Sequence, residues 1–200
     1  MEYHLVNWEQ LHDSTFKLAQ KISKNKIKFD LIVSIARGGY CISHILSDLL
    51  SLPITSFTIS SYRDLKQSSL PEITFKIENK LHNKNILLVD DISDTGKTFI
   101  RGIKYLKSLG AKHITTVSLF IKPWTKFTPD YYIQSVNKWI ILPYETRETI
   151  ESLNKMDDQY FESKKGNELP IKLTTAFSDD TYRAYKQGKL IEQKGGKIIL

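Results

Sequence analysis

The sequence predicts an α/β fold, in which a mostly parallel β-sheet is flanked by helices. Two predominantly apolar runs, at residues 31–36 and 86–89, are typical of strands that are buried on both faces of such a sheet. A segment with helical periodicity follows each run, at residues 40–50 and 98–109. Because parallel strands need a long crossover connection, this alternation of strands and helices favours a parallel sheet.

The other elements are assigned in the order of the chain. Residues 8–26 have apolar side chains at helical spacing, which predicts an amphipathic first helix. Pro53 marks the exit from the second helix, and residues 54–60 then alternate like a strand. Gly110 closes the third helix. A hairpin-like stretch is predicted at residues 73–77, and further strands at residues 114–121, 131–133 and 139–141.

The chain of 200 residues is long enough for one domain with a modest appendage. We expect residues 1–150 to form this domain and residues 151–200 to form a C-terminal extension, to which we assign no chemistry. Within the extension, the Gly195-Gly196 pair between apolar ends predicts a hairpin.

Composition and charge argue against several kinds of partner. The excess of 29 Lys and Arg over 22 Asp and Glu gives a net charge of +7, but the lysines are scattered, which argues against a nucleic-acid binder. No apolar run is long enough to cross a bilayer, so we expect no membrane association. The N-terminus lacks the pattern of a secretion signal, and the single cysteine, Cys41, cannot form an internal disulfide. We therefore expect a cytoplasmic protein.

The clearest chemical signal is the stretch ILLVDDISDTGKT, which spans residues 86–98. A buried strand here delivers the carboxylates of Asp90 and Asp91 to its carboxyl end, where open α/β sheets bind ligands. A short turn then leads into the third helix, whose first N–H groups suit a phosphate because they lie in the positive field of the helix dipole. Threonine hydroxyls in the turn add donors, and its glycine permits close approach.

Two other interpretations of this stretch are less favourable. A nucleoside-triphosphate P-loop needs a glycine five residues before Gly96, but Asp91 stands there. A structural role, with Asp94 as a helix cap and the acidic pair as a solvated strand end, explains one carboxylate more easily than three. Three crowded carboxylates repel one another and call for a cation or sugar hydroxyls nearby. A binding site is therefore favoured.

This stretch resembles the signature with which type I phosphoribosyltransferases bind phosphoribosyl pyrophosphate (PRPP). The resemblance implies the fold of that family, a mostly parallel sheet with a small hood. It also implies that Asp90 and Asp91 bind the ribose hydroxyls of PRPP, directly or through Mg²⁺, and that Asp94 handles the proton near N7 of a purine base. The turn that binds the 5′-phosphate would comprise Asp94, Thr95, Gly96, Lys97 and Thr98.

A second motif, SIARGG at residues 34–39, ends the first core strand. Taken alone, it fits an ordinary glycine turn with a surface arginine. In the family that the chain resembles, such a loop binds pyrophosphate, often after a strained peptide just before the arginine. The resemblance therefore assigns pyrophosphate binding to Arg37 and Gly38. The guanidinium of Arg37 suits this role because it can donate two parallel hydrogen bonds to phosphate oxygens.

Two later segments bear on the identity of the base. Lys122 ends the third core strand before a proline, and Trp139 precedes an apolar run that ends in Pro-Tyr-Glu. Each residue alone fits core packing or a solvated strand end. Together they resemble the xanthine-guanine and other 6-oxopurine phosphoribosyltransferases, although residues 124–127 are richer in aromatic side chains than expected from them. The resemblance assigns purine binding to Lys122 at O6, Trp139 by stacking, the Ile140 carbonyl group, and Glu145.

The chemistry of these residues agrees with a 6-oxopurine. A lysine only donates hydrogen bonds, so it favours a 6-oxo group over the 6-amino group of adenine. An aromatic face contributes about 1–3 kcal/mol by stacking on a base.

These features predict a Mg²⁺-dependent purine phosphoribosyltransferase of nucleotide salvage that acts as a homodimer or homotetramer. It would convert PRPP and a purine, preferably hypoxanthine, guanine or xanthine, to the nucleoside monophosphate and pyrophosphate. Adenine is an alternative, because the lysine can swing aside.

A non-catalytic regulator that senses PRPP or a nucleotide is a second alternative. It is less favoured because the chain before Leu31 is too short for a winged-helix domain and because Asp94 is retained. A pyrimidine substrate is disfavoured by Lys122 and Trp139. Residues 61–71 leave two interpretations equally open, either an ordinary connection or a loop that closes over PRPP, since Ser61-Tyr62 resembles a pair in 6-oxopurine enzymes.

Overall fold

The computed structural model describes residues 2–24, 26–60, 71–78, 80–145 and 149, and the backbone of residues 197–199. The chain divides into two compact units, which are described separately. The larger unit comprises residues 9–137, and the smaller unit combines residues 1–8 with residues 138–200. The predicted boundary near residue 150 lies outside the described residues, as do residues 61–70 of the loop predicted at residues 61–71.

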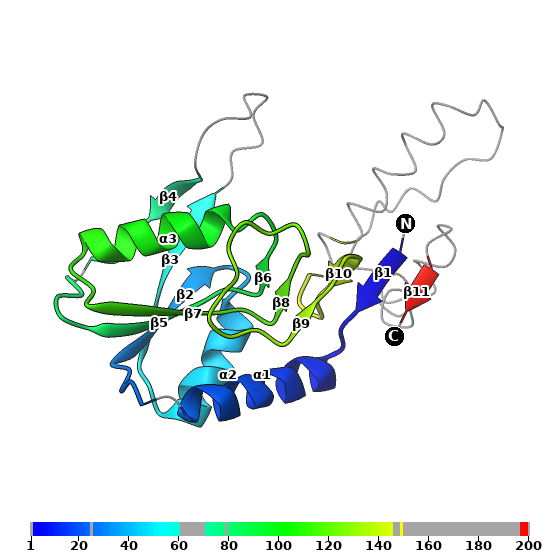
Figure 1. Ribbon diagram of the computed structural model, residues 1–200, viewed down its shortest axis with the longest axis horizontal. Helices are drawn as coiled ribbons and strands as arrows, with labels where there is room; N and C mark the ends of the chain where they lie inside the picture. The colour runs from blue at the N-terminus through cyan, green and yellow to red at the C-terminus, as the bar shows by residue number, and fades with distance from the viewer. Residues whose placement is uncertain are drawn as a thin grey trace, which may run out of the picture. The chain divides into compact units, whose positions relative to one another are not determined.

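The larger unit is built on a five-stranded sheet with the strand order β4-β3-β2-β5-β7 (Figure 1). Strands β2, β3, β5 and β7 are parallel, and β4 at the edge is antiparallel to β3. This arrangement confirms the predicted mostly parallel sheet. The strand bounds are β2 (Leu31–Ala36), β3 (Ile54–Ser60), β4 (Glu72–Phe75), β5 (Asn85–Val89) and β7 (His113–Val117).

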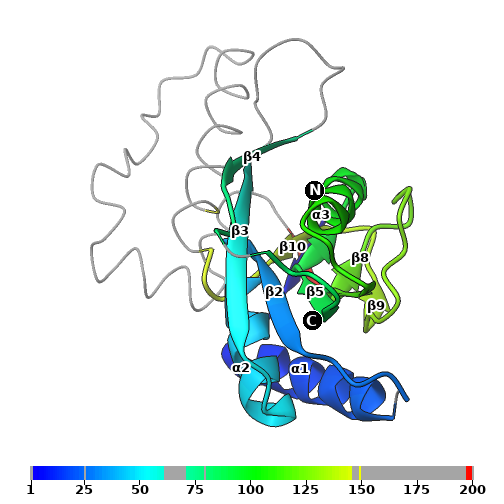
Figure 2. The same ribbon diagram turned by 90° about the vertical axis from the view of Figure 1, so that its left-hand side faces the viewer.

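Helices cover both faces of this sheet. Helix α3 (Lys97–Ser108) lies on one face, and α1 (Trp8–Ser23) and α2 (Tyr40–Leu50) lie on the other (Figures 1 and 2). The α3 face is closed by a buried apolar cluster that includes Val33 and Phe57 from the sheet and Phe99 from the helix. The predicted bounds of α2 are confirmed, whereas α1 ends three residues earlier than predicted. At that end, the Ser23 hydroxyl turns back and donates to the Gln20 carbonyl group.

The order of the strands creates a topological switch point between β2 and β5. From β2 the chain passes through α2 to β3 on one side, and from β5 it passes through α3 to β7 on the other side. Helices that leave neighbouring strands toward opposite faces open a crevice beyond the carboxyl ends of those strands, which is where such folds bind ligands. The two motifs singled out in the sequence follow β2 and β5.

A second, smaller sheet in the same unit corrects two strand predictions. It consists of the parallel strands β6 (Ile92–Ser93), β8 (Phe120–Ile121) and β9 (Gln134–Ser135). The single strand predicted at residues 114–121 is divided into β7 and β8, because the N–H groups of Leu119 and Phe120 both turn to the Asp91 carbonyl group. The strand predicted at residues 131–133 is also wrong. Tyr131 forms only an isolated bridge with Val117.

The smaller unit contains a three-stranded parallel sheet with the order β10-β1-β11. Its strands are β1 (Glu2–Leu5), β10 (Trp139–Ile141) and β11 (Lys197–Ile199). The strand at residues 139–141 was correctly predicted, but it pairs with β1 and not with the main sheet. The predicted hairpin turn at Gly195-Gly196 lies outside the described residues, and β11 after it runs parallel to β1. In the described part of the chain, none of the helices has the length and hydrophobicity of a membrane span.

Candidate active site

The loops after β2 and β5 lie against each other. Ser34 is in register with Val89, so both strands reach the carboxyl edge of the sheet side by side. A Cβ atom added at Gly38 would overlap the carboxylate of Asp91, which shows how closely the two loops approach. The peptide bond between Ala36 and Arg37 is cis. The structure thus brings the predicted pyrophosphate loop and the predicted acidic motif together.

Asp90 and Asp91 form a close acidic pair behind this contact. The N–H group of Asp91 donates to Oδ1 of Asp90 at 3.0 Å, and the N–H group of Ile92 donates to Oδ1 of Asp91 at 2.7 Å. Asp90 is only 7% exposed. Burial first, and then the charge of Asp91, raise the pKa of Asp90 well above its usual value. A buried acid beside a second acid is stabilised when a cation or hydroxyl donors approach.

The two carboxylates of the acidic pair have the chemistry to assist in holding a Mg²⁺ ion. Among the described residues, no group of three or more His, Cys, Asp and Glu side chains could hold a metal ion. Mg²⁺ usually keeps water and phosphate ligands and needs only one or two carboxylates from the protein. Asp90 and Asp91 are the residues that would hold it.

The turn after β6 leads into the N-terminus of α3. Gly96 has a φ of +79° and forms the N-cap, and a Cβ atom there would lie 2.5 Å from Cβ of Phe127. The N-cap residue Gly96 has no side chain that could cap the helix, and the N–H group of Lys97 donates to Oγ1 of Thr95 at 3.4 Å. The first N–H groups of a helix have no partner within the helix, so this end suits an anion. Helix α3 begins at Lys97, one residue before the predicted start.

Asp94 and Lys122 leave neighbouring strands side by side. Ser93 at the end of β6 is in register with Ile121 at the end of β8, and the N–H group of Lys122 donates to the Ser93 carbonyl group at 3.0 Å. Lys122 is 8% exposed. Burial lowers the pKa of Lys122, and the charge of Asp94 opposes that shift. The predicted proton-handling acid and the predicted O6 donor are therefore electrostatic neighbours.

Sequence reasoning assigned no role to Trp124, which contacts both of these residues. Its indole Nε1–H donates to Oδ1 of Asp94 at 2.8 Å, and Nζ of Lys122 lies 5.6 Å from the centroid of the Trp124 ring. The only sequence signal for this contact was the unusual aromatic content of residues 124–127.

Ser93 was also missed, because a single serine gives no pattern. It is buried, and its hydroxyl donates to the Phe127 carbonyl group at 2.8 Å and lies 3.0 Å from Oγ1 of Thr125. The N–H group of Lys126 donates in addition to the Thr95 carbonyl group at 3.3 Å. Residues 122–127 are therefore fastened to the turn that precedes α3.

The remaining predicted purine-binding residues belong to the smaller unit. Trp139 is 45% exposed, and Ile140 beside it is buried. Oε2 of Glu145 accepts a hydrogen bond from the N–H group of Leu142 at 3.4 Å. The structure thus gathers these three residues on β10 and the turn after it, and their contact with a purine stays a prediction.

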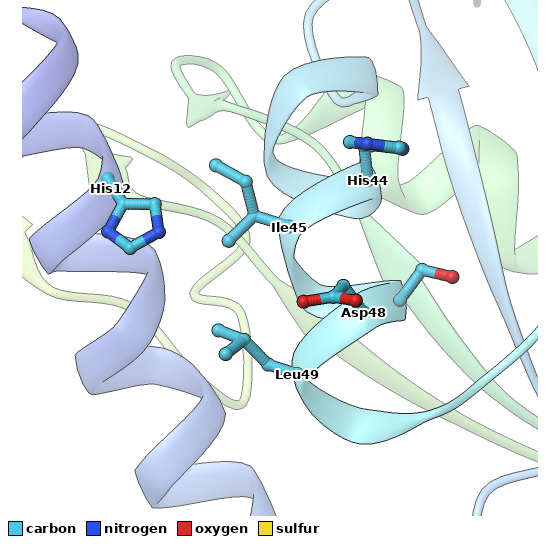
Figure 3. Close-up of a pocket in the computed structure, with 6 residues that line it drawn as sticks. His12, His44, Ile45, Asp48 and Leu49 are labelled. Carbon is cyan, nitrogen blue, oxygen red and sulfur yellow. The ribbon is translucent and has the colours of Figure 1, made fainter.

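A separate hollow of 360 Å³ lies between α1 and α2 (Figure 3). His12 of α1 faces Ile45 and Leu49 of α2 across it, and His44 and Asp48 lie on the same helix as the two apolar residues. None of its lining residues belongs to the loops after β2 and β5. The hollow is therefore distinct from the predicted phosphate site.

A switch-point crevice beside an acidic pair and a helix N-terminus is an arrangement with which open α/β sheets bind phosphorylated ligands. Residues 6–149 match the phosphoribosyl transferase domain family. The chain belongs to the phosphoribosyltransferase family.

Several solved structures resemble this chain in fold. A purine phosphoribosyltransferase from Pyrococcus horikoshii is 39% identical, with 72% of this chain and 95% of that chain covered and a TM-score of 0.65. The xanthine-guanine-hypoxanthine phosphoribosyltransferase of Helicobacter pylori is 24% identical, with 77% and 99% covered and a TM-score of 0.66. A hypothetical protein from Neisseria gonorrhoeae with bound ppGpp is 21% identical, with 80% and 98% covered and a TM-score of 0.63. The last two similarities establish the shared fold alone.

Proposed function

We propose that the chain is a purine phosphoribosyltransferase of nucleotide salvage that uses a 6-oxopurine, namely hypoxanthine, guanine or xanthine. The observation that carries this proposal is the pairing of β6 with β8, which sets Asp94 beside Lys122 next to the acidic pair. An acid and a lysine in this position match N7 and O6 of one purine edge. The 39% identity to a purine phosphoribosyltransferase supports a purine as the base.

The loops at the switch point would bind PRPP. Asp90 and Asp91 face the ribose hydroxyls and assist Mg²⁺, which when bound neutralises charge on the departing pyrophosphate. Arg37 and Gly38 hold the pyrophosphate, and residues 95–98 at the start of α3 hold the 5′-phosphate. In the reaction, N9 of the base forms a bond to C1 of the ribose as the bond from C1 to the pyrophosphate oxygen breaks.

The base would be recognised by hydrogen bonds, proton transfer and stacking. Lys122 donates to O6, and Asp94 takes up the proton near N7 as N9 attacks. Trp139 stacks on the ring, the Ile140 carbonyl group accepts from the base, and Glu145 lies near it. A donor that cannot accept disfavours the amino group of adenine.

The setting of the enzyme is part of the same proposal. We place it in the cytoplasm, where its single cysteine needs no partner. We expect a homodimer or homotetramer, as the family resemblance implies.

The direct test is an assay with Mg²⁺ and PRPP and each of hypoxanthine, guanine, xanthine and adenine, in which the nucleotide formed is measured by chromatography. We expect turnover with the 6-oxopurines and little with adenine. Asp94→Asn is the matched variant, since it keeps the shape of the side chain but cannot take up a proton, and should lose about a hundredfold or more in kcat. Turnover with adenine alone would contradict the assigned base, and no turnover with any purine would contradict the proposed function.

A further inference from the structure

We propose that Trp124 is a positioning residue for Asp94 and Lys122, two of the residues that read the base. Its indole N–H orients the carboxylate of Asp94, and its ring face holds the ammonium group of Lys122. This inference rests on the proposed function, in which Asp94 and Lys122 act on one purine. It assigns specificity to a segment that departs from the 6-oxopurine enzymes which the chain otherwise resembles.

The contact with Asp94 fixes one of the two carboxylate oxygens. The distance of 2.8 Å from Nε1 to Oδ1 is that of a well-formed hydrogen bond. The indole group only donates, so this contact selects an accepting oxygen at Asp94. Asp94 itself is exposed, and without a donor its carboxylate could rotate freely. With Oδ1 bound, Oδ2 is left in a fixed direction to receive the proton from the base.

The contact with Lys122 uses the electron-rich face of the indole ring. The ammonium group lies 5.6 Å from the ring centroid, within the range of a cation–π interaction. Lys122 is buried, which disfavours its charged form, whereas the ring face and the Asp94 carboxylate both favour that form. Trp124 therefore helps to keep the O6 donor charged and in one place.

Trp124 can position other groups because its own segment is held in place. The N–H group of Thr125 donates to the Lys122 carbonyl group at 3.0 Å, and its hydroxyl donates to the Phe127 carbonyl group at 3.1 Å. Ser93 fastens the same carbonyl group to β6. The Trp124 side chain is nevertheless 56% exposed, so it is accessible from solvent while its backbone is fixed.

Two substitutions separate the two contacts. Trp124→Phe keeps an aromatic face but removes the N–H donor. We expect its kcat to fall about ten- to a hundredfold, the usual effect of losing a hydrogen bond to a charged group, with the KM for hypoxanthine within about twofold of wild type. Trp124→Leu removes the ring as well. It should also raise the KM for hypoxanthine about tenfold and reduce the ratio of kcat/KM for hypoxanthine to that for adenine. Trp8→Phe is the matched control, because Trp8 is also 56% exposed.

A double-mutant cycle and a spectrum test whether Trp124 acts through Asp94. In the Asp94→Asn background, Trp124→Phe should lower the residual kcat by less than about twofold, since the group that it positions is gone. In ¹⁵N-labelled protein, the indole N–H resonance that is lost in Trp124→Phe should be the one that moves in Asp94→Asn. Thermal unfolding of each variant verifies that it is folded.

The outcomes distinguish this inference from the proposed function. An active wild-type enzyme with a Trp124→Phe variant of unchanged kcat, or with additive effects in the cycle, would overturn the positioning role alone. A wild-type protein that forms no nucleotide from any purine would overturn the proposed function and this inference with it. A reduced kcat with unchanged KM, no additivity and a shifted indole resonance would support it.

Discussion

At the residue scale, the acidic pair after β5 is electrostatically unfavourable in the folded protein. Asp90 is buried beside Asp91, and both burial and the neighbouring charge raise the pKa of Asp90. A core packed only for stability would replace such an acid with a neutral side chain. Its presence is consistent with a residue that is retained for ligand binding, where strained electrostatics are common.

We expect Asp90→Asn to stabilise the protein and to abolish PRPP binding. The free energy of unfolding at pH 7 should rise by about 1–2 kcal/mol, because the amide removes a buried charge next to Asp91. Chemical denaturation measures this change. Asp48→Asn, an exposed site on α2, is the control and should change stability by less than about 0.5 kcal/mol. A marked destabilisation by Asp90→Asn would contradict the electrostatic account.

The pH dependence of stability follows from the same raised pKa. The folded protein binds the Asp90 proton more tightly than the unfolded chain does, so the contribution of Asp90 to stability is greatest at low pH. That contribution is lost as the pH rises from the usual value of 3.8 through the raised pKa. In a comparison of unfolding at several pH values, the difference between wild type and Asp90→Asn should therefore grow across this window. A constant difference would show that Asp90 has an ordinary pKa.

Two neighbouring glycines should respond differently to an added methyl group. At Gly39, a Cβ atom would lie 2.5 Å from the Val89 carbonyl oxygen, so the backbone must shift and Gly39→Ala should lose about 1–3 kcal/mol of stability. At Gly38 the methyl group meets the end of the Asp91 side chain, which can rotate away. Gly38→Ala should therefore keep stability within about 1 kcal/mol but lower kcat/KM for PRPP at least about tenfold. If Gly38→Ala lowered stability but left kcat/KM for PRPP unchanged, the loop that contains Gly38 would have no role in substrate binding.

At the scale of elements, the pairing of two short strands brings Asp94 and Lys122, the residues proposed to read the base, close together. Asp94 was predicted from a motif and Lys122 from a resemblance, but their proximity depends on the pairing of β6 with β8. Strands of two residues carry no alternating pattern, so they could not be predicted from the sequence. The long elements were predicted well, and the bounds of β2, α2 and β3 agree with the structure, because their apolar patterns extend over several residues.

A substitution of Ser93 tests whether the attachment of residues 122–127 to β6 matters for the site. Ser93→Ala removes the hydrogen bond to the Phe127 carbonyl group, and we expect a loss of about 1–2 kcal/mol of stability. Because residues 122–127 are then less firmly held, the preference for hypoxanthine over adenine should also decrease. Ser108→Ala on the exposed surface of α3 is the matched control, since it also removes a serine hydroxyl bonded to a carbonyl group. Equal effects of the two substitutions would contradict a special role for Ser93.

At the scale of the whole molecule, the net charge of +7 should influence the binding of PRPP, a small polyanion. We expect kcat/KM for PRPP to fall several-fold as the salt concentration rises from about 0.05 to 0.5 M, because salt screens long-range attraction. The same measurement for the neutral base hypoxanthine, at saturating PRPP, is the control and should change little. Equal salt effects on both substrates would show that the charge does not steer PRPP.

The organisation of the chain into units could be predicted only in part. The α/β class and the ligand edge follow from the apolar runs and the acidic motif. The pairing of β1 with β10 and β11 could not be predicted, because it joins segments from opposite ends of the sequence. The role of Trp124 could not be predicted for a similar reason. Its contacts with Asp94 and Lys122 depend on how a loop folds back over a neighbouring turn.

The central claim is that the turn after β5 holds the phosphorylated sugar, and a crystal structure with bound inosine or guanosine monophosphate tests it most directly. We expect the 5′-phosphate to contact the backbone N–H and hydroxyl groups of residues 95–98, with the ribose hydroxyls facing Asp90 and Asp91. A nucleotide whose phosphate is bound elsewhere, with this turn empty, would contradict the claim.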